Sequence, residues 1–201
     1  RSGLEIDESV DTAVCALPLA VLGHGVHQRD GPPLELILVG GRKIASAAQV
    51  LRLYGPSFHP VDDFNVPPGA TQAIFTTIQA LAHAGDEVIA FEPAYDSYIP
   101  SVQLAGATPV PLPLTFPDYR IDWDAVRAAL TPRTRFILLN TPNNPGTSVL
   151  AAADLDELAA IVRDTPIVVI GDEVSEHMVY DGARHESLAR HEELAARSVV
   201  I

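Results

Sequence analysis

The sequence predicts an α/β fold with a doubly wound, mostly parallel β-sheet. Expected strands and helices alternate along the chain at the spacing of βαβ units. The inner strands are continuous apolar runs, as in parallel sheets that are covered on both faces. Polar residues follow several of these strands directly, and ligands of such sheets bind at the carboxyl ends of the strands.

The composition excludes several classes of protein. Hydrophobic residues make up 47% and charged residues 19% of the 201 residues, which predicts a globular domain. The net charge of -13 repels phosphate backbones, so we expect no nucleic-acid partner. The longest apolar stretch, 13–22, is too short to span a membrane and contains Pro18, so we expect no membrane partner. Cys15 is the single cysteine, which fits a cytoplasmic protein.

The chain divides into two parts, residues 1–43 and residues 44–201. The first part contains one expected strand, at 34–39, and no helical period of useful length. The second part carries the regular alternation. The chain starts with Arg1, and its only methionine is Met178, so we expect that it is not a complete translation product.

The regular part begins with a helix expected at 70–85, which follows two prolines and Gly69. A buried strand is expected at 87–91. The next helix, at 95–106, is interrupted by Pro100.

The alternation continues to the end of the chain. The segment 108–114 is expected to be extended, and the helix at 122–130 has Asp122 as its N-cap. The remaining elements are strands at 135–140, 166–173 and 198–201 and a helix at 151–164.

The start of the first helix is a candidate phosphate site. The backbone amides of Gly69, Ala70 and Thr71, together with the helix dipole, suit an anion. A glycine before a helix is also ordinary turn chemistry, and the local sequence leaves both interpretations open.

Two tyrosines follow the strand at 87–91. Tyr95 and Tyr98 offer flat faces to an aromatic cofactor, or they pack on the helix and core.

Polar residues also follow the two later strands. Asn144 lies in an asparagine-rich and proline-rich loop, where its side chain is a possible donor to a ring oxygen or a carboxylate. Asp172 ends an apolar strand, where a carboxylate can hold a pyridine nitrogen protonated. An ordinary turn and a strand-end cap are the alternatives for these two residues.

Four motifs in order carry a family resemblance: GATQAIF at 69–75, GDEVIAFEPAYDSY at 85–98, TRFILLNTPNNPGT at 134–147 and GDEVSEH at 171–177. Together they resemble the class I/II aminotransferases of the fold type I pyridoxal-phosphate enzymes, most of all the kynurenine and methionine aminotransferases. The resemblance covers residues 44–201. It implies that these residues form part of the large, cofactor-binding domain of such an enzyme.

The resemblance also implies roles for individual residues. Gly69, Ala70 and Thr71 would hold the phosphate of pyridoxal 5'-phosphate, and Tyr95 would stack on its ring. Asn144 would bond the ring hydroxyl oxygen and lie close to the substrate carboxylate. Asp172 would pair with the pyridine nitrogen. The implied substrates are an amino acid and a 2-oxo acid, the implied assembly is a homodimer, and no metal is implied.

The sequence departs from the family in two positions that matter for catalysis. Ser175 stands where the family has a tyrosine that bonds the ring oxygen, and serine is too short to reach that atom directly. The Schiff-base lysine of the family is absent, since Lys43 is the single lysine and lies far upstream. His177, His185 and His191 are expected to be surface or loop residues.

We therefore expect an aminotransferase by descent that is truncated before its catalytic lysine, with no catalytic residue in the chain and no transamination by the 201 residues alone. A β-lyase on the same scaffold and a non-catalytic protein that binds the cofactor or a partner chain are the alternatives.

Overall fold

The structure is a computed structural model that describes residues 14–17, 35–38, 64–65 and 67–201. Its centre is a five-stranded sheet in which all neighbouring strands run parallel, in the order β5-β4-β6-β7-β8. The predicted α/β fold is therefore confirmed. The expected boundary near residue 43, including Lys43, lies outside the described residues.

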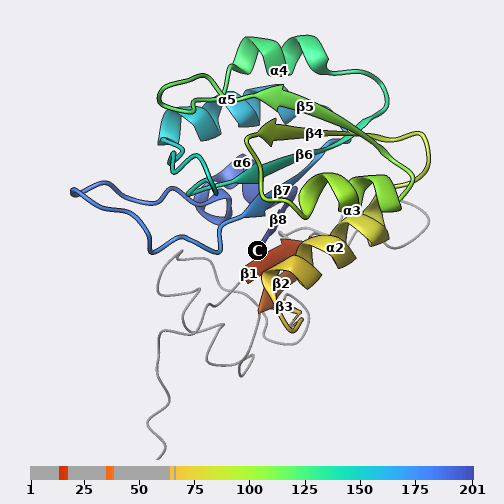
Figure 1. The fold of residues 1–201 in the computed structure, drawn as a ribbon, viewed down its shortest axis with the longest axis horizontal. Coiled ribbons are helices and arrows are strands. Elements are labelled where there is room, and N and C mark those ends of the chain that lie inside the picture. The colour runs from red at the N-terminus through yellow and green to blue at the C-terminus, as the bar shows by residue number, and fades with distance from the viewer. Residues whose placement is uncertain (1–13, 18–34, 39–63, 66) are drawn as a thin grey trace, which may run out of the picture.

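The elements of this sheet alternate with helices (Figure 1). The strands are β4 (Glu87–Glu92), β5 (Thr108–Pro113), β6 (Thr134–Asn140), β7 (Val168–Asp172) and β8 (Ser198–Val200). The helices are α2 (Ala70–Leu81), α3 (Tyr98–Leu104), α4 (Trp123–Ala129), α5 (Ala152–Val162), the 3-10 helix η2 (Leu188–Arg190) and α6 (Glu192–Ala195).

A second, three-stranded sheet contains β1 (Val14–Leu17), β2 (Glu35–Leu38) and β3 (Phe64–Asn65). The strand predicted at 34–39 is confirmed as β2. Strand β1 was not predicted, because its apolar residues run directly into Pro18 without an alternating pattern. Both β1 and β2 contact β8 of the large sheet.

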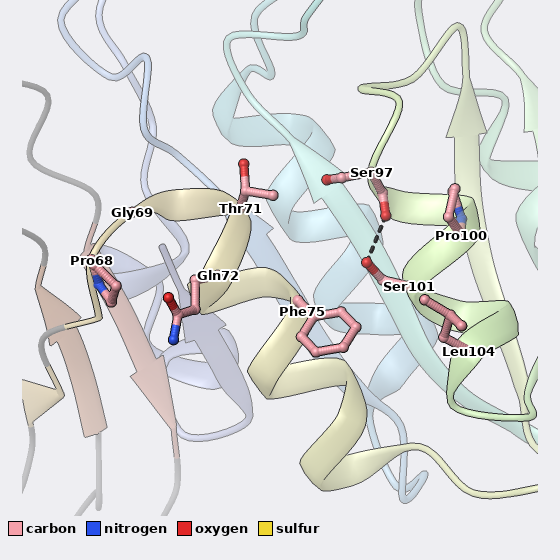
Figure 2. A pocket seen from close by; sticks show the side chains of 9 residues that line it. All are labelled: Pro68, Gly69, Thr71, Gln72, Phe75, Ser97, Pro100, Ser101 and Leu104. Carbon is pink, nitrogen blue, oxygen red and sulfur yellow. Dashed lines mark hydrogen bonds between the residues drawn. The ribbon is translucent and has the colours of Figure 1, made fainter.

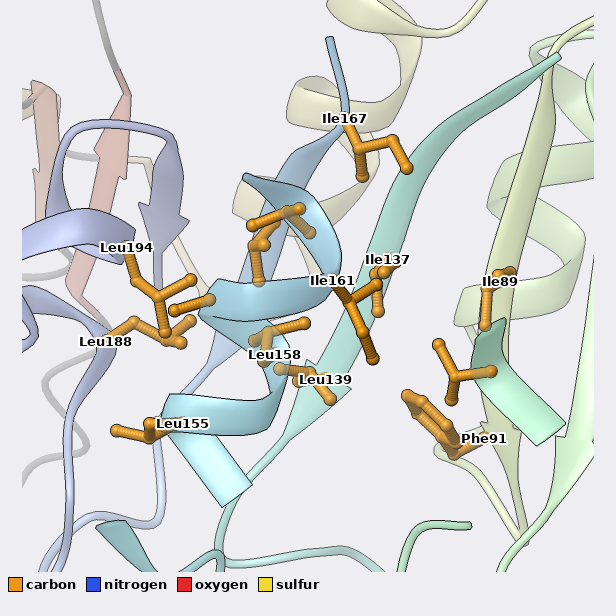
Figure 3. Packing of buried hydrophobic residues seen from close by; sticks show 14 of the residues in the cluster. Ile89, Phe91, Ile137, Leu139, Leu155, Leu158, Ile161, Ile167, Leu188 and Leu194 are labelled. Carbon is orange, nitrogen blue, oxygen red and sulfur yellow. The ribbon is translucent and has the colours of Figure 1, made fainter. Parts of the chain in front are cut away.

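Two apolar layers cover the faces of the large sheet, because alternate strand residues point to opposite sides. Ile89 and Ile137 pack against α5 on one face (Figure 3). Val169 and Val126 of α4 belong to the same cluster. On the other face, Val88 and its neighbours pack against α2 and α3. The side chain of a residue at the carboxyl end of a strand therefore lies on one face of the sheet or on the other.

Strand β5 explains how a segment with three prolines joins the sheet. The N–H groups of Thr108 and Leu114 donate to carbonyls on the β4 side. Since amide directions alternate along a strand, the ring nitrogens of Pro109, Pro111 and Pro113 point away from β4. No ladder hydrogen bond is lost, and β5 is an edge strand of the described sheet.

Two predicted helices are shorter than expected. Helix α2 ends at Leu81 because Ala82 is extended and the Asp86 carboxylate accepts the His83 N–H at 2.9 Å, which closes a turn before β4. Helix α3 begins at Tyr98, so Pro100 lies in its first turn, where no intrahelical partner for an N–H exists. The predicted N-cap Asp122 is confirmed, with the Asp124 and Ala125 N–H groups each at 3.0 Å.

The strand order reverses between β4 and β6. The chain passes from β4 outward to β5, then crosses back to β6 and continues to β7 and β8 on the other side. In doubly wound sheets such a switch point leaves a crevice at the carboxyl ends of the strands. The polar residues predicted to be functional follow β4, β6 and β7 and so lie at this edge.

Candidate functional site

The first turn of α2 presents free backbone amides. The Ala73 N–H donates to the Gly69 carbonyl at 3.0 Å, so the N–H groups of Ala70, Thr71 and Gln72 precede the first bond within the helix. A Cβ atom added at Gly69 would meet nothing within 4 Å, so the space beside this turn is open. The turn is suited to an anion such as a phosphate.

Asp172 ends β7 and is buried, with 4% of its surface exposed. The Tyr98 hydroxyl donates to its Oδ2 at 2.5 Å, and the Val174 N–H donates to its Oδ1 at 3.2 Å. Both donors are neutral, and a carboxylate oxygen can accept more than one hydrogen bond. Asp172 therefore keeps acceptor capacity for a further partner, and a cationic ring nitrogen is the partner that a buried carboxylate favours.

Burial raises the pKa of Asp172, since it disfavours the charged form. The hydrogen bonds from Tyr98 and Val174 act in the opposite direction, and the charge of Glu173 raises the pKa further. Burial also raises the pKa of Tyr98, and the nearby Asp172 charge adds to this. Tyr98 therefore acts as a hydrogen-bond donor to the carboxylate.

Tyr95 connects the helix start to this buried pair. Its hydroxyl lies 3.2 Å from the Thr71 hydroxyl, and its ring meets Tyr98 edge to face with a centroid separation of 5.7 Å. Thr71, Tyr95, Tyr98 and Asp172 thus form one continuous series of contacts. The structure brings together three predicted cofactor residues that are far apart in the sequence.

The two tyrosines take different roles. Tyr98 is 2% exposed and belongs to the core. Core packing was the alternative to cofactor stacking for both rings. Tyr95 is only partly buried. It remains the predicted stacking residue.

The loop after β6 is held against β7 by Asn140. Its side-chain amide donates to the Asp172 carbonyl at 3.0 Å, and its Oδ1 accepts the Asn144 N–H at 2.6 Å. Asn143 braces the same loop by accepting the Gly146 N–H at 2.8 Å. The Asn144 side chain is exposed, and no hydrogen bond joins it to the described residues. Asn144 is therefore placed by its neighbours and is free to meet a ligand.

Ser175 lies in the turn that directly follows Asp172 and is partly buried. Its carbonyl accepts the Met178 N–H at 2.8 Å. The turn itself is closed by a bond of 2.8 Å from the Glu176 N–H to the Glu173 carbonyl. Ser175 is thus adjacent to the carboxylate in the chain, and its role toward a cofactor stays a prediction.

Sequence reasoning missed three features of this region. The Tyr98–Asp172 bond and the Asn140 bridge join residues 74 and 32 positions apart, and no short motif contains both partners. The third feature is the burial of His185. The residue lies in a loop, as expected, but it is 8% exposed and pairs with buried Glu173 at 2.9 Å.

The other two histidines are nearer to the expectation. The His177 side chain is 73% exposed. The His191 side chain is 20% exposed and lies 3.2 Å from the Asp156 carboxylate.

A hollow of about 580 Å³ between α2 and α3 shares the helix start with this site (Figure 2). Gly69 and Thr71 lie at one end, and Phe75 and Leu104 lie farther along it. Neither Asp172 nor Asn144 lines it. The hollow is a surface groove that begins beside the helix start.

The fold and the candidate site together define an α/β protein with an open helix start, a partly buried tyrosine and a buried carboxylate near the switch point of a parallel sheet. The chain belongs to the aminotransferase class I and II family, whose model matches residues 42–200. This family depends on pyridoxal phosphate. The resemblance inferred from the four motifs is therefore confirmed.

Three individual proteins illustrate the similarity. The chain is 41% identical over 200 residues to a "probable N-succinyldiaminopimelate aminotransferase DapC" of Mycobacterium tuberculosis, covering 90% of this chain and 50% of that protein. It is 38% identical over 149 residues to kynurenine--oxoglutarate transaminase 1 of Rattus norvegicus, covering 69% and 35%. A crystal structure of YbdL from Escherichia coli, described as having a methionine aminotransferase function, matches with a TM-score of 0.76 and 40% identity over 78% of this chain and 41% of that chain.

The chain spans about half the length of curated relatives that it matches. Within the described residues, no helix is both long enough and apolar enough to cross a membrane.

Proposed function

We propose that this chain forms the cofactor-binding part of a pyridoxal-phosphate-dependent aminotransferase, which moves an amino group from an amino acid to a 2-oxo acid. The observation that carries the proposal is the buried Asp172 at the end of β7, bonded to Tyr98 at 2.5 Å and joined through Tyr95 to the open first turn of α2. Family membership supports the same conclusion.

The residues present suit this cofactor. The amides of Ala70 and Thr71 beside Gly69 would hold its phosphate, and the ring of Tyr95 would lie against its pyridine ring. Asn144 would bond the ring hydroxyl oxygen and lie near the substrate carboxylate, while Ser175 would face the same oxygen. The cofactor supplies an electron sink for the carbon that carries the amino group.

Asp172 is the residue with the clearest chemical task. The Asp172 carboxylate is held in one orientation because it accepts hydrogen bonds from the Tyr98 hydroxyl and the Val174 N–H. A carboxylate in this position would stabilise a proton on a ring nitrogen beside it. Tyr98 lowers the pKa of Asp172 against the effect of burial. The hydrogen bond from Tyr98 therefore favours the ionised form of Asp172, although burial raises the pKa overall, and a protonated ring nitrogen beside it would favour the same form.

The 201-residue polypeptide is proposed to bind the cofactor without a covalent link to a lysine at this site. Its single lysine is Lys43, and Ser175 replaces the tyrosine that the motif leads us to expect. A polypeptide of these residues alone is therefore proposed not to catalyse transamination.

Two further features of the complete protein belong to the proposal. We propose a homodimer, supported by the exposed apolar side chains of Phe75 and Leu104 along the groove between α2 and α3, which are 39% and 72% exposed. We also propose a cytoplasmic location. Sedimentation analysis of the purified protein tests the first, and fractionation of the source cells tests the second.

The cofactor proposal is tested by titrating the purified chain with pyridoxal phosphate and following its absorption spectrum. Borohydride treatment and intact mass then show whether a covalent link has formed. Saturable binding with no mass increase after reduction is expected. An Asp172→Asn variant should bind at least about tenfold more weakly, because a charge-assisted bond is lost.

The matched control is Asp118→Asn, which alters an exposed carboxylate and should leave binding unchanged. Failure of the unaltered chain to bind, or equal binding by the two variants, would contradict the proposed site. A mass increase on reduction would place the link on Lys43 or the amino terminus.

A further inference from the structure

A buried acid–histidine pair lies directly beside the proposed cofactor site. Glu173 and His185 are 3% and 8% exposed, and Oε2 of the glutamate lies 2.9 Å from Nε2 of the imidazole. A carboxylate only accepts hydrogen bonds, so Nε2 is the donor. The other ring nitrogen, Nδ1, is buried without a hydrogen-bond partner among the described residues.

The same glutamate holds the chain at both ends of a long surface segment, 174–187. This segment leaves the sheet just after Glu173. It returns at His185, and the Leu188 N–H donates to Oε1 of Glu173 at 2.8 Å. Figure 1 shows the segment, in blue after β7, projecting from the body of the protein. Met178 and Tyr180 within it are 59% and 75% exposed.

The segment begins with residues that belong to the proposed site. The Val174 N–H donates to Oδ1 of Asp172 at 3.2 Å, and Ser175 follows at once. The Glu173 N–H is itself anchored to the Ile201 carbonyl at 2.7 Å. A change in how the segment closes on Glu173 therefore acts on the turn that orients the Asp172 carboxylate.

We propose that His185 is a positioning residue for the cofactor site: it closes the segment 174–187 onto Glu173 and so holds the Val174 amide against Asp172 and Ser175 beside it. The inference rests on the proposed function, since it concerns how well the site accepts the cofactor. His185 acts through Glu173 and the backbone turn.

The backbone of His185 is held independently of its ring. Nη2 of Arg190 donates to the His185 carbonyl at 2.9 Å. Replacing the ring therefore leaves this anchor and the bond from the Leu188 N–H to Glu173 in place, and the effect of a substitution reports on the bond between the imidazole and Glu173.

Three variants of the 201-residue chain separate positioning from mere stability. His185→Ala removes the donor, His185→Gln retains an amide donor at a similar distance along the side chain, and His83→Ala is the control at a histidine whose side chain is 76% exposed. Each is titrated with pyridoxal phosphate by equilibrium dialysis. Hydrogen exchange of peptides covering 173–187 is followed by mass spectrometry.

We expect His185→Ala to weaken cofactor binding about tenfold and to speed exchange in the peptide that contains Val174. His185→Gln should restore affinity to within about threefold, and His83→Ala should match the unaltered chain. Faster exchange in His185→Ala with unchanged affinity would overturn the inference, because the pair would then be structural only. Equal losses in the Gln and Ala variants would overturn it as well.

Three further outcomes are decisive. If His185→Ala does not fold, His185→Asn, whose amide is too short to reach Glu173, is compared with His185→Gln, and equal affinities would overturn the inference. If the unaltered chain shows no saturable binding, the proposed function fails and the inference fails with it. If the unaltered chain binds the cofactor and His185→Ala binds it equally well, the inference fails but the proposed function stands.

Discussion

The hydroxyl of Tyr98 lies 2.5 Å from Oδ2 of Asp172, although the two residues are 74 positions apart in the chain. Both are almost fully buried, at 2% and 4% exposed. The bond joins the start of α3 to the end of β7 across the apolar face that α2 and α3 cover. It orients the carboxylate on which the proposed cofactor site depends.

Removing this hydroxyl should therefore affect both stability and binding. Tyr98→Phe should destabilise the chain by about 1–3 kcal/mol, because a buried acceptor loses its partner. It should also weaken pyridoxal phosphate binding, since the pKa of Asp172 rises further without this bond. Urea unfolding and cofactor titration measure the two effects. Unchanged affinity would show that Tyr98 only fills the core.

The raised pKa of Asp172 predicts a pH dependence of stability. A carboxyl whose pKa is higher in the folded chain stabilises the fold most below its ordinary pKa of 3.8. That stabilisation is lost as the pH rises through the folded-state pKa. The free energy of unfolding should therefore fall more steeply with pH above 3.8 in the unaltered chain than in Asp172→Asn. Identical slopes in urea unfolding at a series of pH values would contradict the prediction.

Tyr95 should contribute mainly through its ring. Tyr95→Phe removes only the contact of its hydroxyl with Thr71, at 3.2 Å, and should change cofactor affinity less than about threefold. Tyr95→Ala removes the flat face and should reduce affinity by about tenfold or more. Fluorescence titration compares the two variants. A loss as large in Tyr95→Phe as in Tyr95→Ala would assign the role to the hydroxyl.

The start of α4 offers a test away from the site. Asp122→Ala removes an acceptor for two backbone N–H groups, each at 3.0 Å, and should destabilise the chain by about 1 kcal/mol. Cofactor binding should remain unchanged. Asp118→Ala, at an exposed acid outside a helix, is the control for loss of charge, and an equal destabilisation there would exclude the capping explanation.

Gly171 is required by packing. A Cβ atom there would lie 2.3 Å from Cδ1 of Leu188, so Gly171→Ala should destabilise the chain by about 1–3 kcal/mol. In a double-mutant cycle, part of this cost should disappear in the background of Leu188→Val, whose shorter side chain leaves room. Strict additivity of the two substitutions would show that Leu188 is not the obstacle.

Local sequence signals were sufficient for much of the fold. The apolar run that ends at Asn140 predicts a buried parallel strand, and β6 is buried on both faces. Asp122 before an apolar helical pattern predicts an N-cap, and its carboxylate accepts the expected amides. The end of α2 was misplaced because the carboxylate of Asp86, the residue after the expected end of the helix, accepts the His83 N–H. The helix propensities of the residues do not predict that contact.

By itself, the sequence determined the alternation of strands and helices, the family and the residues expected at the carboxyl edge of the sheet, because each depends on neighbours within a few positions. Only the tertiary structure decided that Tyr98 bonds Asp172, that Asn140 joins two strand ends and that His185 is buried against Glu173. These contacts arise when the folded chain brings strand ends, a helix start and a loop together. Burial then requires each polar group brought inside to find a partner, and the identity of that partner depends on the three-dimensional arrangement.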